Sequence, residues 1–131
     1  MYSKDMLTGI ILSSFVLELR INKDKKLAIG YRTTVSLVAR GNLDWLNAIK
    51  RSLLQHGITS KLNAKESKNR PSPLLRISSV NNLTKVKTLL KDLPSRNFKI
   101  NQFNELVDLI ANKRHLTLNG FDIILKLKGV I

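Results

Sequence analysis

The feature that most constrains the fold is a repeated switch between helical and strand periodicity. Segments with apolar residues at helical spacing are each followed by two segments in which apolar and polar residues alternate. In chain order these are residues 3–14 (helical), 16–22 and 31–40 (alternating), 43–57 (helical), and 58–66 and 74–80 (alternating). Because alternation with period two places the apolar residues on one face of a strand, this order predicts two helix–hairpin units.

Further helical patterns complete the chain. They cover residues 81–93, 100–115 and 116–130. Ser3 is an expected N-cap for the first helix, Gly57 a C-cap for the second and Thr117 a cap for the last. We therefore predict an α+β fold in which four antiparallel strands pack an aliphatic face on helices and leave a basic, hydroxylated face outside.

Length and composition limit the class of protein. The 131 residues, without cysteine, suit one domain over residues 1–131, with neither a disulfide framework nor a cysteine-based zinc site. No apolar run approaches the roughly 18 residues of a transmembrane helix. The N-terminal residues lack the Arg-rich amphipathic pattern of a transit peptide, so we expect no cleavable leader.

The net charge indicates the partner. Lys and Arg number 23 against nine Asp and Glu, which gives a formal charge of +14. A phosphate backbone is the usual partner of such an excess. The alternative, a basic protein on a membrane surface, would concentrate its charge on one amphipathic helix, whereas here the charge is spread along the chain. We expect nucleic acid and no membrane.

The outer face of the predicted sheet is the candidate binding surface. Each cation there, taken singly, is typical of a solvated strand face, but together they form a pattern. Cations contact phosphates, and the short polar side chains between them can reach base edges. The candidate contact residues, with one from the basic loop at residues 67–73, are Arg20, Asn22, Arg32, Thr34, Ser36, Arg40, Lys61, Asn63, Lys65, Arg70, Arg76 and Ser78.

The order of elements and three strings resemble the LAGLIDADG homing-endonuclease family over nearly the whole chain. LTGIILSSF (residues 7–15) lies over the signature helix without a gap, LDWLNAIKRSLLQHGI (43–58) resembles the second helix, and NKRHLTLNGFDIILKLKGV (112–130) is similar to the C-terminal string. The resemblance implies an αββαββα domain with a four-stranded antiparallel saddle sheet and additional C-terminal helices.

The resemblance also implies a role for the first helix, which in that family packs against the same helix of a second domain. The corresponding interface residues here are Leu7, Gly9, Ile10, Ile11 and Ser13. This helix carries more apolar surface than one small sheet can cover. We therefore expect a homodimer, or a larger RNA–protein assembly, formed through the first helix.

At its catalytic positions the chain departs from the family. There a carboxylate near the end of the first helix holds a divalent metal, typically Mg²⁺, that activates water for phosphodiester cleavage. The two acidic positions fall on Leu12 and Ser14, and neither side chain replaces a carboxylate. Glu18 is a weak surrogate. We therefore expect no catalytic residue, metal ligand or cofactor, with Mg²⁺ required only if the chain is a nuclease.

Three functions follow from these observations. The favoured one is a catalytically inactive, RNA-binding protein, either a splicing-maturase-like factor or a structural component of a large ribonucleoprotein such as an organellar ribosome. The alternatives are a homodimeric homing endonuclease that cleaves double-stranded DNA and a DNA-binding regulator on the same fold. The Lys-, Asn-, Ile- and Leu-rich composition fits an AT-rich genome, so we expect a mitochondrial location, or otherwise another organelle or a prokaryotic cytoplasm.

Overall fold

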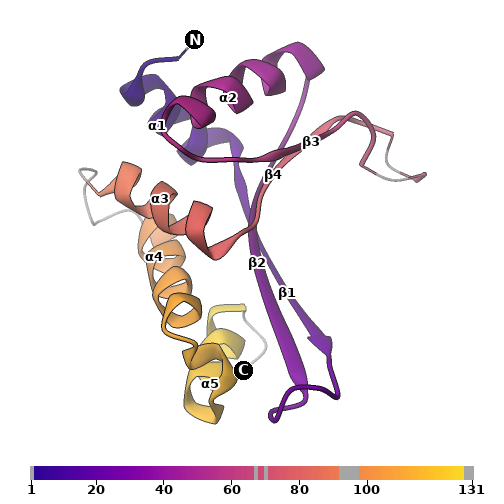
Figure 1. Ribbon diagram of the computed structural model, residues 1–131, viewed down its shortest axis with the longest axis vertical. Coiled ribbons are helices and arrows are strands. Elements are labelled where there is room, and N and C mark those ends of the chain that lie inside the picture. The colour runs from indigo at the N-terminus through magenta and orange to yellow at the C-terminus, as the bar shows by residue number, and fades with distance from the viewer. Residues whose placement is uncertain (1, 67, 70, 92–97, 129–131) are drawn as a thin grey trace.

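The computed structural model describes residues 2–66, 68–69, 71–91 and 98–128. The elements in these residues are α1 (Lys4–Ser14), β1 (Val16–Lys23), β2 (Tyr31–Arg40), α2 (Leu43–Gln55), β3 (Lys61–Asn63), β4 (Leu74–Ile77), α3 (Val80–Leu90), α4 (Phe98–Ala111), the 3₁₀ turn η1 (Arg114–Leu116) and α5 (Leu118–Lys128). Figure 1 shows α1 and α2 at one end of the molecule and α5 near the far end of the long β1–β2 hairpin. The predicted order of helices and strands is confirmed.

The four strands form one antiparallel sheet in the order β1-β2-β4-β3. β1 pairs with β2 along its whole length, from Val16 opposite Val38 to Lys23 opposite Tyr31. β4 pairs with β3 on one side and, on the other, with residues 37–40 of β2 alone. In the described part of the chain, residues 31–36 of β2 therefore have a strand neighbour on one side only.

The second hairpin is shorter than the alternation predicted, because polar side chains redirect its ends. The backbone N–H of Thr59 donates to Asn82 Oδ1 of α3 at 3.0 Å instead of joining a strand. Ser79 accepts a hydrogen bond from the backbone N–H of Asn82 at 3.1 Å and so caps α3. The cap ends β4 at Ile77 and starts α3 at Val80.

Two apolar clusters hold the helices on the sheet. The larger joins α1, α2 and α3 to the inner face of β2, where Val35, Leu37 and Ala39 are buried. The smaller packs Leu106 and Ile124, from α4 and α5, on β1. Burying each large aliphatic side chain contributes about 1.5–3 kcal/mol, so the C-terminal helices are part of the folded unit.

Local signals at the helix ends are confirmed. Ser3 Oγ accepts a hydrogen bond from the backbone N–H of Met6 at 3.3 Å, and Gly57 follows α2 with a φ of +75°. Thr117 Oγ1 accepts from the backbone N–H of Gly120 at 3.1 Å at the start of α5. No helix among the described residues is both long and apolar enough to span a bilayer.

Candidate nucleic-acid interface

The strand register brings most of the predicted contact residues onto one surface, which we call the basic face. Arg32 lies opposite Asn22, and Thr34 lies opposite Arg20. Arg76 of β4 lies opposite Val38 of β2 and opposite Lys61 of β3. The basic face comprises Arg20, Asn22, Arg32, Thr34, Ser36, Arg40, Lys61, Asn63 and Arg76. Three predicted residues lie elsewhere: Lys65 and Ser78 follow the ends of β3 and β4, and Arg70 lies outside the described residues.

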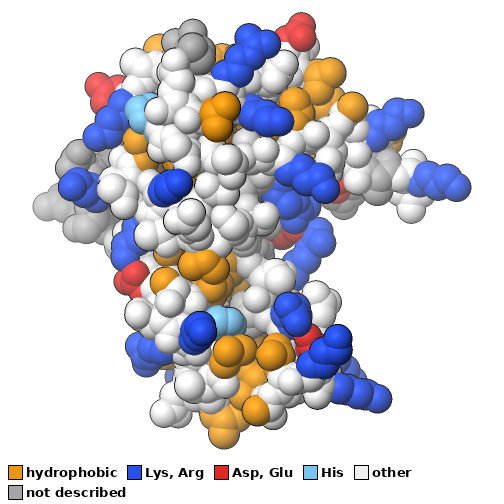
Figure 2. All heavy atoms as spheres, viewed as in Figure 1, with side chains coloured by type: hydrophobic (Ala, Val, Ile, Leu, Met, Phe, Trp, Pro, Cys, Tyr) orange, Lys and Arg blue, Asp and Glu red, His pale blue; other side chains and the backbone are white. Residues whose placement is uncertain are grey.

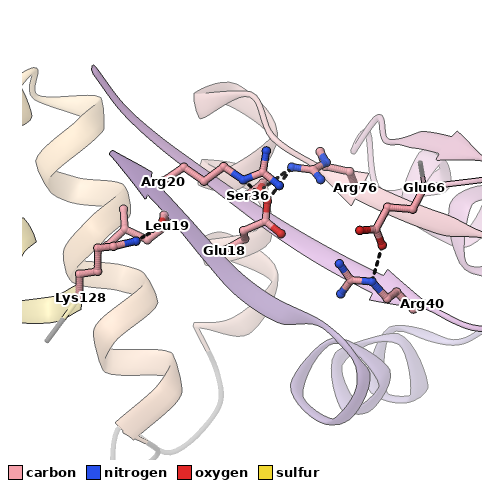
Figure 3. Close-up of polar contacts among 8 residues, drawn as sticks. All are labelled: Glu18, Leu19, Arg20, Ser36, Arg40, Glu66, Arg76 and Lys128. Carbon is pink, nitrogen blue, oxygen red and sulfur yellow. Dashed lines mark hydrogen bonds and ion pairs between the residues drawn. The ribbon is translucent and has the colours of Figure 1, made fainter. Parts of the chain in front are cut away.

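Carboxylates hold the arginines of the basic face in place. Glu18 Oε1 lies 2.8 Å from Arg20 Nε and accepts a hydrogen bond from Arg76 Nη1 at 3.0 Å. Arg76 Nη1 also donates to Ser36 Oγ at 3.2 Å (Figure 3). Ser36, predicted as a base contact, is only 6% exposed, so it positions Arg76 instead of facing outward.

The other two arginines are paired in the same way. Arg32 Nη2 lies 2.7 Å from Asp24 Oδ2, and Arg40 Nε lies 2.6 Å from Glu66 Oε1. The backbone N–H of Lys26 and the Arg32 side chain hold the pKa of Asp24 below its ordinary value. The hydrogen bond to Glu66 raises the pKa of Arg40. These contacts favour the charged forms of Asp24 and Arg40.

Sequence reasoning missed the role of these acids. The alternation in β1 already places Glu18 on the same face as Arg20, but only the register shows that it also reaches Arg76. Ion pairs at exposed positions contribute about 0–1 kcal/mol each, and the Arg20 and Arg32 side chains are 58% and 57% exposed. A phosphate oxygen can therefore replace a carboxylate oxygen at little cost.

Lys and Arg side chains are spread over the drawn face of the molecule. Figure 2 shows them over the helices as well as along the sheet side, where several lie beside a hollow at mid-height. On the far side of β1, Lys128 Nζ of α5 donates to the backbone oxygen of Leu19 at 2.7 Å (Figure 3). The rings of Tyr31 and Phe121 stack with centroids 5.4 Å apart. The C-terminal helix thus contacts the long hairpin that carries six of the nine residues of the basic face.

The buried and exposed faces of the first helix differ from the prediction. Leu7 and Ile11, predicted as interface residues, are 0% and 3% exposed and belong to the core, because α1 packs them against the sheet. The outward strip of α1 consists of Met6, Gly9 and Ser13, with Ile10 half-buried beside it. A Cβ added at Gly9 would meet no heavy atom within 4 Å. At the centre of the exposed strip, Gly9 therefore has no side chain to keep another helix away.

The end of α1 does not fit a magnesium site of the kind that the resemblance implies. Ser13 Oγ and Ser14 Oγ lie 3.2 Å apart, and Ser13 Oγ also donates to the backbone oxygen of Ile10 at 3.4 Å. Neutral hydroxyls are poor substitutes for carboxylate ligands of a hard divalent cation. Glu18, the candidate surrogate, is held by two arginines. Among the described residues, no group of three or more His, Asp or Glu side chains could hold a metal ion.

No protein-family model and no curated protein sequence matches the chain. Solved structures do match. The homing endonuclease I-TnaI superposes with a TM-score of 0.79 at 16% identity, over 96% of this chain and 85% of that one. The archaeal intron-encoded homing endonuclease I-Vdi141I, complexed with DNA, gives 0.78 at 20% identity, over 95% and 78%.

A third solved structure bears on size. The I-SmaMI LAGLIDADG homing endonuclease bound to cleaved DNA gives a TM-score of 0.80 at 22% identity, over 100% of this chain and 44% of that one. At these identities the likeness establishes the fold, which is the LAGLIDADG homing-endonuclease fold that the sequence predicted. This chain spans less than half the length of I-SmaMI.

Proposed function

We propose that this chain is a nucleic-acid-binding domain that binds the phosphate backbone through the basic face of its sheet and does not cleave it. The observation that carries the proposal is the row of positioned arginines across β1, β2 and β4 on this fold. Guanidinium groups bind phosphate through paired hydrogen bonds. Carboxylate partners hold these side chains extended over the sheet before the ligand arrives, which lowers the entropy lost on binding.

Loss of cleavage is proposed from the residues at the end of α1. The resemblance places the family's acidic positions on Leu12 and Ser14, and the described hydroxyls there bond to each other and to the helix backbone. Without a carboxylate, the chain supplies no anionic ligand to hold and orient a divalent cation at that point. Binding then remains as the activity that the basic face can supply.

We also propose that α1 forms an interface with a second copy of this chain or with another subunit of a ribonucleoprotein. The likeness to less than half of I-SmaMI supports this proposal. So does the strip of Met6, Gly9 and Ser13, whose small central residue permits close approach of another helix. Met6 is 57% exposed and would be covered there.

The RNA partner expected from the sequence is a proposal, and duplex DNA is its competitor because solved neighbours of this fold are bound to DNA. A competition titration decides between them. The protein is offered labelled duplex DNA and structured RNA over a range of salt, with and without Mg²⁺, and the products are run on a denaturing gel. Tight binding to RNA without cleavage supports the proposal. Mg²⁺-dependent double-strand cuts at one DNA site overturn it.

The role of the basic face has its own test. The double variant Arg32→Ala, Arg76→Ala is compared with Arg51→Ala, Lys126→Ala, which removes two exposed cations from α2 and α5. For the first, the slope of log affinity against log salt should fall by about two, roughly one for each lost phosphate contact. The control should keep its slope. Equal slopes for the two variants would move the binding surface away from the sheet.

A further inference from the structure

A cavity of about 740 Å³ lies beside residues 33–36 of β2, next to the connection from β4 to α3. One wall is formed by residues 33–36 of β2 with Arg20 and Arg76, which belong to the basic face. The opposite wall comes from the start of α3, the end of α4 and the turn η1. The volume lies within the usual range for a small-molecule site, and the cavity opens directly from the proposed binding surface.

The lining of this cavity combines an apolar part with a cationic rim. The apolar part is formed by aliphatic side chains: Val35, Val80, Leu83, Ile110 and Leu116. The rim carries Arg20, Arg76 and Lys113, and Glu18 pairs with the first two. The rim therefore keeps an excess of positive charge. A ligand with a flat apolar body and an attached anion matches both parts.

Two polar atoms at the cavity lack partners. Thr33 Oγ1 and His115 Nδ1 are buried, and neither has a hydrogen-bond partner among the described residues. Thr33 is 8% exposed, and both residues line the cavity. Buried polar atoms are rarely left without a partner, because the loss costs about 1–3 kcal/mol. Because both atoms have almost no accessible surface, a bound group reaches them after a small shift of the side chains that cover them, and that shift would give both atoms a partner.

The backbone keeps this wall in position. Lys113 adopts a left-handed conformation, with a φ of +57°, that turns the chain from α4 into η1. The start of α5 packs so closely on this turn that a Cβ at Gly120 would lie 1.8 Å from the backbone oxygen of Arg114. The turn at Lys113 and the close packing of α5 on η1 therefore keep His115 and Leu116 at the cavity.

We propose that this cavity receives a single unstacked nucleotide of the nucleic acid bound on the basic face. The base would lie between the aliphatic side chains with its polar edge at Thr33 and His115, and its phosphate would contact Arg20 or Arg76. Sequence-specific RNA recognition commonly uses bases splayed out of loops and bulges, with stacking on aromatic rings or Arg guanidinium planes; here Arg20 and Arg76 supply the guanidinium planes and the remaining contacts are aliphatic. The proposal rests on the function proposed above, and it adds a preference for unpaired nucleotides.

The test uses two RNA hairpins, and the corresponding DNA hairpins, that are identical except for one unpaired adenosine in the stem. The wild-type protein should bind the bulged hairpin about tenfold more tightly than the paired one, the effect of gaining roughly one good base contact. A 2-aminopurine at the bulge should brighten on binding as it leaves the stack. Val80→Trp, which fills the cavity from the 41% exposed first residue of α3, should remove the preference and keep the affinity for the paired hairpin.

Leu43→Trp is the matched control, because Leu43 is the first residue of α2, is 44% exposed and does not line the cavity. It should behave as the wild type. Thr33→Val, which removes the unpartnered hydroxyl and keeps the shape, should lower the preference without a loss of stability. Together these variants separate a filled cavity from a damaged fold.

Several outcomes would overturn the proposal. Equal binding of bulged and paired hairpins by the wild type rejects the cavity's role and leaves the basic face intact. Binding of neither hairpin rejects the proposed function itself. Adenosine monophosphate alone is also titrated. If its affinity for the wild type equals that of the bulged hairpin, and Val80→Trp abolishes its binding, the cavity is a site for a free nucleotide instead.

Discussion

Glu18 Oε1 and Arg76 Nη1 lie 3.0 Å apart, although 58 positions separate the two residues in the chain. β1 and β4 are not neighbours in the sheet, because β2 lies between them. The contact therefore crosses the middle strand, where Ser36 Oγ accepts a second hydrogen bond from Arg76 Nη1. One carboxylate thus connects the two hairpins and also places two arginines on the basic face.

Replacing Glu18 by Gln should strengthen nucleic-acid binding. The Gln amide oxygen can still accept the hydrogen bonds that position Arg20 and Arg76, while the negative charge is removed; for a phosphate bound at about 7 Å the lost repulsion would be roughly 0.6 kcal/mol in water, so affinity should rise about threefold at low salt. The cost in folding free energy should stay below about 1 kcal/mol for the pair with the exposed Arg20, and the Gln amide oxygen keeps the hydrogen bond to the half-buried Arg76. Fluorescence anisotropy and urea unfolding measure the two effects. Glu105→Gln, an exposed site on α4, changes the net charge equally and should leave affinity unaltered; an equal gain there would deny Glu18 a local role.

Gly9→Leu should prevent self-association through α1. The added side chain projects into open space in the monomer, and replacing a helical glycine stabilises the monomer by about 0.5–1 kcal/mol. Sedimentation equilibrium should show the dimer weakened while the melting temperature is kept or raised. Gln55→Leu, which adds the same exposed side chain at the end of α2, is the control. An unchanged monomer–dimer equilibrium in Gly9→Leu would place the interface elsewhere.

Gly120→Ala should destabilise the protein, because the new Cβ would lie 1.8 Å from the backbone oxygen of Arg114 and the turn η1 would have to move. Overpacking of this kind costs about 1–3 kcal/mol. The same substitution at Gly9, where there is space, should have the opposite sign. Urea unfolding of the two variants gives the comparison, and a stabilised Gly120→Ala would show that α5 does not start against η1.

The Asp24 carboxylate, which accepts a hydrogen bond from the backbone N–H of Lys26 and pairs with Arg32, should make the free energy of unfolding depend on acid pH. Its folded pKa lies below the ordinary value, so its contribution is complete above that value and is lost as the pH falls through the lowered folded pKa. Asp24→Asn should therefore be less stable than the wild type near neutral pH, and the gap should close in strong acid. Asp122→Asn, an exposed site on α5, should show no such convergence; if Asp24→Asn keeps a constant gap, the carboxylate is not the cause.

Much of this fold could be predicted because its signals are local. The caps at Ser3 and Thr117 depend on side chains within three residues. The alternation in β2 separates Val35 and Leu37 from Arg32 and Thr34 without any knowledge of neighbours. The predicted strands that correspond to β3 and β4 are longer than the observed ones, because hydrogen bonds to Asn82 and Ser79 compete with strand pairing there.

The residue pattern alone indicates the order of elements, the face of each strand that carries the cations, and the lack of carboxylates at Leu12 and Ser14. Tertiary packing is what brings Glu18 to Arg76, buries Leu7 while Gly9 stays exposed, and forms a cavity beside β2. Periodicity orients a side chain about the axis of its own element. Which distant element lies opposite depends on register and packing, and in α1, which is apolar around most of its circumference, the core side is chosen by what packs against it.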